Sequence, residues 1–167
     1  MTGDVYVAID QGGHATRASA YGKDGSVEGA ALVTIETQRN ALGHVEHDPE
    51  EIIASVGTAL GELEHIVPSS RWVAAGFAVQ RSSLVCWSAD DGRALSPVIS
   101  WQDTRNAAWL KGLARRADDV QRLTGLQLSP HYGASKLRWC LDYLPVVRSA
   151  AAQSKLHAGP LASFLLH

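Results

Sequence analysis

The sequence predicts an α/β fold with a mixed sheet, and three observations carry that prediction. The first forty residues contain short alternating apolar segments between glycine-rich turns, which is typical of antiparallel strands. A helix start follows at Asp48, and an almost wholly apolar segment follows that helix. A strand that comes after a crossover helix is a candidate for parallel pairing with an earlier strand. We therefore expect both antiparallel and parallel neighbours in one sheet.

The N-terminal strands are predicted at residues 5–10, 16–21 and 27–38. Two glycine-containing turns, at 11–14 and 22–25, separate them. Glycine and aspartate are residues that tight turns favour. These three strands are therefore expected to form an antiparallel meander.

The first helix is predicted at residues 49–66. Asp48 is suited to cap its N-terminus, and Pro49 suits the first helical position. Apolar residues then recur every three or four positions until Pro68 ends the pattern. Residues 72–79 are almost entirely apolar, as expected of a strand that is covered on both faces.

The C-terminal half is predicted to contain a hairpin and three helices. The hairpin comprises residues 84–88 and 94–101 around an Asp-Asp-Gly turn. The helices are expected at 104–116, 118–123 and 132–144, and a glycine or proline stop signal follows the last two.

The organisation of the whole chain is predicted from its size and its end. We find no internal repeat and no linker rich in Pro, Gly or Ser, so residues 1–167 are expected to form one partial domain around one core. The last residues, Phe164-Leu165-Leu166-His167, form an apolar run with no stop signal. We therefore expect the chain to be incomplete at its C-terminus.

Composition argues against several classes of function. The chain has 15 basic and 17 acidic residues and a formal net charge of −2, so it lacks the basic surface of a nucleic-acid binder. Its longest apolar run, at 73–79, is far shorter than the ~20 residues of a membrane span. Cys86 and Cys140 show no redox or zinc spacing. We expect a cytoplasmic protein without nucleic-acid or membrane partners.

The glycine turn after the first strand is the first candidate site. Asp10 ends the strand, consecutive glycines follow, and Arg17 comes shortly after. Consecutive glycines let backbone N–H groups converge on an anion, a carboxylate can hold hydrated Mg²⁺, and arginine pairs with phosphate oxygens. A tight hairpin with Asp10 as its cap explains the same residues. Taken alone, the motif favours the hairpin, because it lacks the lysine of a P-loop.

Four separated segments favour the anion-binding interpretation of this turn over the simple hairpin. They are Val7-Ala8-Ile9-Asp10-Gln11-Gly12 with Arg17, Val45-Glu46-His47-Asp48-Pro49-Glu50, Gln80-Arg81 before Val85-Cys86-Trp87, and Trp101-Gln102-Asp103-Thr104-Arg105. In order and spacing they resemble the FGGY family of carbohydrate kinases, and within it the glycerol kinases. Two later segments, Thr124-Gly125-Leu126 and Ser135-Lys136-Leu137-Arg138-Trp139, continue the match. The resemblance runs from about Val5 to the end of the chain.

The resemblance implies an actin-like ATPase (ribonuclease H-like) domain, with a mixed five-stranded sheet and flanking helices, as the N-terminal part of a two-domain kinase. It implies that ATP and Mg²⁺ are used to phosphorylate a hydroxyl of a small sugar or polyol, and it is compatible with a homo-oligomer. The catalytic base of that pattern lies beyond His167. No residue here is assigned as the base, and the isolated chain is expected to be inactive.

The resemblance also assigns two groups of binding residues. The nucleotide-phosphate group, in which Asp10 is the Mg²⁺ ligand, consists of Asp10, Gly12, Gly13, His14, Ala15, Thr16 and Arg17. The substrate group consists of Gln80, Arg81, Ser82, Trp101, Asp103 and His131.

Several contact positions depart from the glycerol kinase pattern. Gly13, His14 and Ala15 stand where that pattern has two threonines and a serine. Ser82 replaces a glutamate and His131 replaces a tyrosine. Loss of a charge-assisted acceptor costs roughly 1.5–3 kcal/mol for a substrate that uses it. We therefore expect altered specificity, with glycerol disfavoured. The alternative is a non-catalytic, truncated or pseudokinase module of the same fold that binds a small ligand or a protein partner.

Overall fold

The computed structural model describes residues 3–167, which fold as two compact units. The first unit comprises residues 3–37 and 47–80, and the second comprises residues 38–46 and 81–167. Each unit has its own cluster of buried apolar side chains. The prediction of one core was therefore wrong, because the second half of the chain buries enough apolar surface to form its own.

The sheet of the first unit has the strand order β3-β2-β1-β6. Strands β1 (Val5–Gln11), β2 (Ala15–Gly22) and β3 (Val27–Thr34) pair antiparallel, and β6 (Trp72–Val79) pairs parallel with β1. The meander and the parallel crossover strand are confirmed. In the described part of the chain this mixed sheet has four strands, one fewer than the family pattern predicts.

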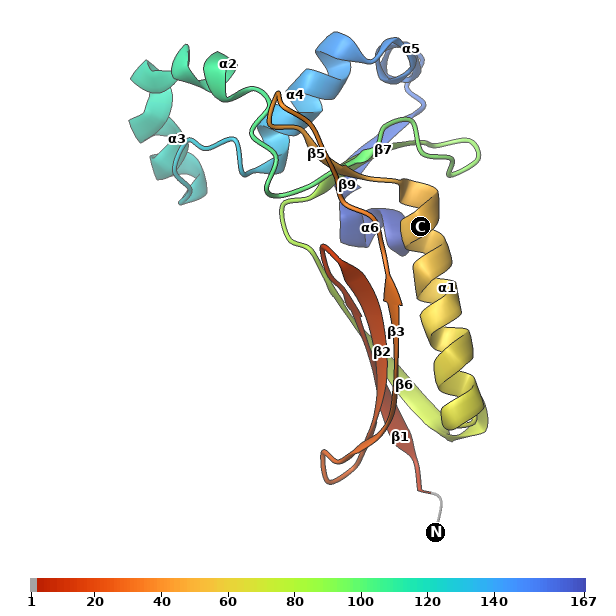
Figure 1. Cartoon of the computed structure of the whole chain (residues 1–167). Coiled ribbons are helices and arrows are strands. Elements are labelled where there is room, and N and C mark those ends of the chain that lie inside the picture. Colours follow the sequence, from red (N-terminus) through yellow and green to blue (C-terminus); the bar gives the residue numbers. More distant parts are fainter. Residues whose placement is uncertain (1–2) are drawn as a thin grey trace. The chain divides into compact units, whose positions relative to one another are not determined.

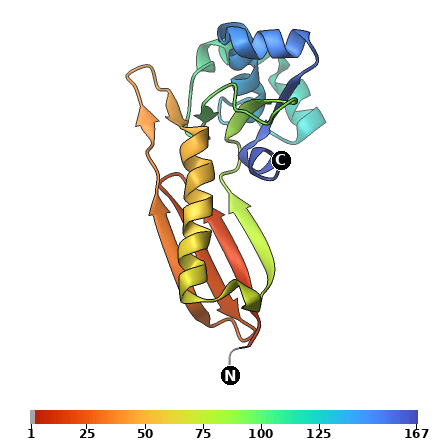
Figure 2. The same cartoon turned by 90° about the vertical axis from the view of Figure 1, so that its right-hand side faces the viewer.

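Helix α1 (Pro49–Ile66) lies along one face of this sheet (Figures 1 and 2). Its N-terminus is capped as predicted, because the Asp48 carboxylate accepts a hydrogen bond of 2.9 Å from the backbone N–H of Glu50. Apolar side chains of α1 pack against the inward residues of β1, β2 and β3. The approach is close: a methyl group on Gly29 of β3 would lie 2.8 Å from Ile66 and Val67. Glycine at this position therefore lets the helix dock.

Strand β6 differs from its prediction. It lies at the end of the strand order, so one of its edges has no strand neighbour among the described residues. Most of its residues are exposed, and Val73 is 57% exposed. The expected cover on both faces is therefore wrong for this chain, although the apolar composition identified the strand correctly. A 3₁₀ turn, Ser69–Arg71, connects α1 to β6.

The sheet of the second unit is built from short strands in the order β4-β5-β8-β7-β9. Their bounds are Gln38–Arg39, Val45–His47, Val98–Ile99, Leu84–Ser88 and Leu156–Pro160. The predicted hairpin exists, since β7 pairs antiparallel with β8, but its second strand has only two residues. Strands β4, β5 and β9 were not predicted. Strands β4 and β5 have two and three residues and carry little alternating pattern, and β9 contains a glycine and a proline, which strands disfavour.

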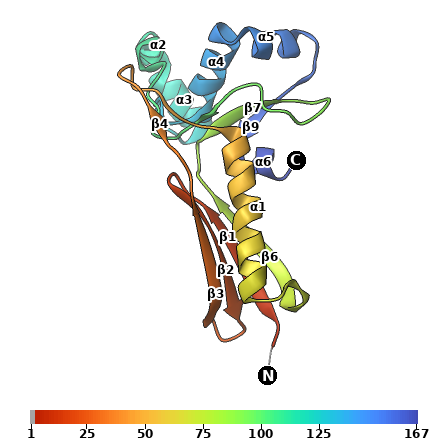
Figure 3. The same cartoon turned by 45° about the vertical axis from the view of Figure 1, so that its right-hand side comes forward.

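Five helices and a 3₁₀ turn surround this sheet (Figure 3). They are α2 (Ala107–Lys111), the turn Ala114–Arg116, α3 (Ala117–Thr124), α4 (Gly133–Tyr143), α5 (Pro145–Ala152) and α6 (Leu161–Leu165). Gly125 ends α3 with a φ of 72°, as a C-terminal glycine should. Pro145 ends α4 but also begins α5. In the described residues no helix is both long and apolar enough to span a membrane.

Replacing Asp48 with Ala should lower the free energy of unfolding by about 1 kcal/mol, because the N–H of Glu50 loses its acceptor. Urea denaturation measures this loss. Asp48→Asn should retain most of the stability. Asp4→Ala is the matched control, since it removes only an exposed contact to Lys23 and should change stability by less than about 0.5 kcal/mol. Equal losses in the Asp48→Ala and Asp4→Ala variants would contradict the capping role.

Candidate functional site

The turn between β1 and β2 is fixed by backbone and side-chain hydrogen bonds. The N–H of Gly12 donates to the carbonyl of Ala15 over 2.9 Å, which closes the turn. The Thr37 hydroxyl donates to the carbonyl of Gly13 over 2.6 Å. The N–H of Ile35 donates to the carbonyl of His14 over 3.0 Å. The chain therefore sets the shape of this turn without a ligand. Thr37 was not predicted to take part, since nothing local in the sequence distinguishes it.

The charged residues of the predicted phosphate group lie next to this turn. Asp10 and Arg17 are opposite each other in the register of β1 and β2, and both are exposed. The backbone N–H groups of Gly13 and His14 have no hydrogen-bond acceptor among residues 3–167. Nothing lies within 4 Å of a methyl group placed on Gly13. Open backbone N–H groups can contact an anion, and the exposed Arg17 offers a positively charged donor on the strand that follows.

The metal predicted at Asp10 needs few protein ligands. No group of three or more His, Cys, Asp or Glu side chains that could hold a metal occurs in the described residues. Mg²⁺ usually keeps several waters and is bound through one or two carboxylates together with substrate phosphates. The exposed Asp10 carboxylate beside the turn fits such a site.

Two predicted residues are used inside the first unit instead. The Thr16 hydroxyl is fully buried and lies 2.7 Å from the hydroxyl of Ser55 on α1. The buried Gln80 amide donates to the carbonyl of Gly12 over 2.9 Å and to the side-chain oxygen of Gln11 over 3.2 Å. The Thr16 hydroxyl is therefore buried below the surface of the turn, and the Gln80 amide supports the turn through two hydrogen bonds. Alternation along β2 turns Thr16 toward α1.

Three of the predicted substrate residues line one pocket in the second unit. Arg81, Trp101 and His131 surround a cavity of about 250 Å³. The rings of Trp101 and His131 meet edge to face, with centroids 5.8 Å apart. The exposed Arg81 supplies a positively charged donor at the same cavity. The pocket therefore combines an aromatic wall with hydrogen-bond donors, which suits a small hydroxylated molecule.

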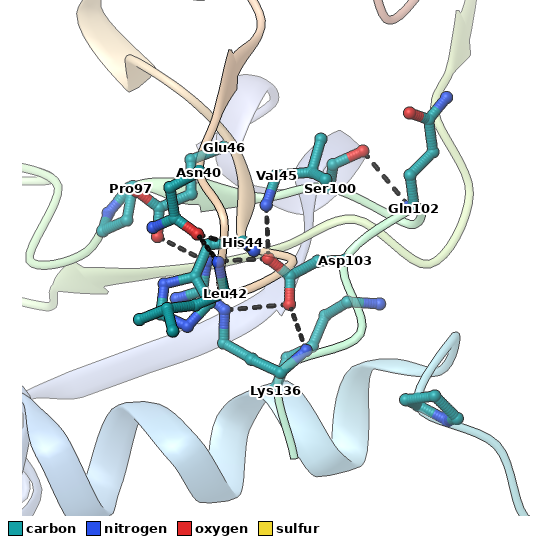
Figure 4. Close-up of polar contacts among 12 residues, drawn as sticks. Asn40, Leu42, His44, Val45, Glu46, Pro97, Ser100, Gln102, Asp103 and Lys136 are labelled. Carbon is teal, nitrogen blue, oxygen red and sulfur yellow. Dashed lines mark hydrogen bonds and ion pairs between the residues drawn. The ribbon is translucent and has the colours of Figure 1, made fainter. Parts of the chain in front are cut away.

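Asp103, by contrast, faces the interior. It is 1% exposed, and its carboxylate accepts a hydrogen bond from the backbone N–H of Val45 (Figure 4). The same carboxylate also accepts hydrogen bonds from the Arg105 side chain. Arg105 also pairs with Glu46 and lies over the ring of Trp139, 4.3 Å from its centroid. The Asp103 oxygens are thus occupied by buried donors, and its predicted contact with the substrate stays a prediction.

The electrostatics of this cluster keep Arg105 charged. Burial by itself lowers the pKa of Arg105, but hydrogen bonds and charge attraction from Asp103 and Glu46 outweigh it and raise that pKa. The guanidinium therefore stays protonated in the core. This buried cluster also holds the segment 38–46 in the second unit, through Val45 and Glu46.

Lys136 of α4 is a second buried cation, for which the sequence did not indicate a role. It is 1% exposed, and its ammonium group donates to the backbone carbonyls of Ser82, over 3.1 Å, and of His131. Burial lowers the pKa of Lys136 from 10.5 to about 8. While the lysine is protonated its burial costs stability, and that cost falls as pH rises from about 8 toward 10.5. Lys136 precedes the buried Cys140 by four residues, and residues four apart lie on the same face of a helix. This spacing is the signal in the sequence that indicates its burial.

Ser82 has an unusual backbone conformation. Its φ of 64° lies in the left-handed region, which side chains with a Cβ rarely adopt. Residues held in this region are frequent at ligand sites. Ser82 also lines a second cavity, of about 290 Å³, together with apolar residues of α4 and β9.

The chain thus combines a mixed sheet, a glycine turn after its first strand and a pocket lined by Arg81, Trp101 and His131. The model of the "FGGY family of carbohydrate kinases, N-terminal domain" matches residues 5–161. The chain therefore belongs to the FGGY family of carbohydrate kinases, of which it is an N-terminal portion.

Relatives in sequence are glycerol kinases. The glycerol kinase of Aromatoleum aromaticum is 39% identical over 164 residues, which cover 96% of this chain and 33% of the relative. The glycerol kinase of Gluconobacter oxydans is 37% identical over 166 residues, which cover 98% of this chain and 32% of the relative. The chain thus spans about a third of the length of these relatives.

Solved structures show the same fold. A crystal structure of Plasmodium falciparum glycerol kinase with ADP matches with a TM-score of 0.88 at 22% identity, over 97% of this chain and 33% of that one. A xylulose kinase from Brucella ovis matches with a TM-score of 0.83 at 24% identity, over 96% and 33% of the two chains. The actin-like α/β fold expected from the sequence is confirmed.

Replacing Asp103 with Ala should lower the free energy of unfolding by about 3–5 kcal/mol, because Arg105 keeps a buried charge without its main partner. Chemical denaturation measures this loss. The matched control is Asp119→Ala, which breaks an exposed pair with Arg122 and should cost less than about 1 kcal/mol. Unchanged stability together with impaired substrate binding in Asp103→Ala would support the substrate role of this residue.

Proposed function

We propose that the whole protein containing this chain transfers the terminal phosphoryl group of ATP to a hydroxyl of a small polyol or sugar. The observation that carries the proposal is the pocket of Arg81, Trp101 and His131 in a chain of the carbohydrate kinase family. The chain covers only a third of its relatives, so this activity belongs to the complete protein. The catalytic base is proposed to lie outside residues 1–167, and the isolated chain is proposed to be inactive.

The pocket residues have distinct proposed roles. The Arg81 guanidinium donates hydrogen bonds to substrate hydroxyl oxygens. The Trp101 ring packs against the carbon skeleton and excludes water from one side. His131 presents an imidazole that donates to or accepts from a second hydroxyl. Serine in place of a carboxylate at Ser82 supports the proposal that glycerol is not the preferred substrate.

The turn after β1 is the proposed phosphate-binding element. Its open N–H groups at Gly13 and His14, with the nearby Arg17, would contact phosphate oxygens. The Asp10 carboxylate would hold Mg²⁺ through its water shell, and the bound ion would neutralise charge on the phosphates. An ADP-bound glycerol kinase among the structural matches is consistent with nucleotide use.

An ADP-release assay over a panel of polyols and sugars on the complete gene product tests this function. Arg81→Ala should raise the KM for the preferred substrate about 10- to 100-fold, because a charged hydrogen bond is lost, while the KM for ATP stays within about twofold. Trp101→Ala should act in the same direction. The exposed Arg122→Ala is the control and should behave as wild type.

The non-catalytic alternative gives a different outcome. If no member of the panel stimulates ADP release, yet calorimetry detects polyol binding that Arg81→Ala removes, the protein is a binding module rather than a kinase. Activity that is unaffected by Arg81→Ala and Trp101→Ala would show that the pocket is not the substrate site.

A further inference from the structure

Two of the three walls of the substrate pocket, those of Arg81 and His131, come from segments that are far apart in the sequence. Arg81 and Ser82 precede β7, whereas His131 precedes α4. No regular secondary structure contains any of these three residues. Their relative position therefore depends on side-chain contacts.

Lys136 connects the two segments. Its ammonium group donates to the carbonyl of Ser82 on one side and to the carbonyl of His131 on the other. Lys136 lies in the first turns of α4, so a regular element positions the bridge. One buried side chain thus fixes both edges of the cavity lined by Arg81, Trp101 and His131.

The energetics favour a specific role for this lysine. A buried ammonium is unfavourable, and an apolar side chain of similar length would avoid that penalty. Asp103 and Arg105, the nearby charged groups, act on it with opposite signs, so attraction to Asp103 is offset in part by repulsion from Arg105. Its hydrogen-bond partners are two carbonyls rather than a carboxylate. What the lysine contributes is therefore the placement of those carbonyls.

The backbone conformation of Ser82 indicates what the hydrogen bond from Lys136 stabilises. A serine at φ 64° is strained, and a hydrogen bond to its carbonyl stabilises that conformation. The bond from Lys136 thereby fixes the carbonyl of Ser82, the residue that directly follows Arg81 in the chain. Release of the carbonyl would let the residue return to an extended or helical φ.

We propose that Lys136 is a positioning residue for the substrate pocket, which clamps the carbonyls of Ser82 and His131 so that Arg81 and His131 face one cavity. The identity of the ligand rests on the proposed function, but the clamp itself does not.

Lys136→Met, which keeps the length of the side chain without its donors, is the direct test. Lys111→Met, at an exposed lysine of α2, is the matched control.

Hydrogen–deuterium exchange measures the clamp independently of catalysis. In the complete protein, Lys136→Met should accelerate amide exchange about 10-fold or more at residues 81–84 and 129–133, and leave residues 5–22 unchanged. Lys111→Met should match wild type throughout. Unchanged exchange in both loops would overturn the proposal. If the methionine variant does not fold, Lys136→Gln, which keeps donors on a shorter stem, replaces it with the same expected result.

Kinetics then separate positioning from general destabilisation. Lys136→Met should raise the KM for the polyol about 10-fold or more without changing the KM for ATP. A polyol KM within about twofold of wild type in Lys136→Met would contradict the positioning role. Absence of turnover in the wild type would refute the proposed function alone, and the exchange measurement would still decide the role of Lys136.

Discussion

Burial of two cations in the second unit is the constraint on which its pocket depends. A charge removed from water is tolerated only where acceptors surround it. Arg105 obtains these from Asp103 and Glu46, which tie the segment 38–46 to the turn before α2. Lys136 obtains them from two carbonyls, which tie the pocket segments to α4. Each buried cation needs hydrogen-bond acceptors, and most of the residues that supply them belong to irregular loops. The hydrogen bonds to the cations therefore hold these loops in fixed positions.

In the first unit the elements were predictable because their signals are local. The cap at Asp48 and the parallel strand after the helix follow from neighbouring residues, and each is present in the structure. Strands β4 and β5 were missed, because two or three residues carry no periodicity and their pairing is set by distant segments. The exposure of β6 was also unpredictable, since an apolar run identifies a strand but not whether both faces are covered.

The candidate site shows the same limit. Residue type and order correctly indicated that Arg81, Trp101 and His131 lie together. They could not show that the Asp103 carboxylate accepts a hydrogen bond from a backbone N–H 58 residues away in the sequence. Nor could they show that the Thr16 hydroxyl points to α1. Polar residues that support a site and polar residues that contact a ligand look alike in sequence. Burial and hydrogen-bond partners distinguish them, and these became visible only with the tertiary structure.

A crystal structure of the complete protein with its best-binding polyol tests the account most directly. The account predicts that the polyol lies in the cavity between Arg81, Trp101 and His131, with hydroxyl oxygens accepting from Arg81 and with Lys136 bonded to both carbonyls. A polyol bound away from these three residues, or a Lys136 ammonium group turned away from Ser82 and His131, would contradict it.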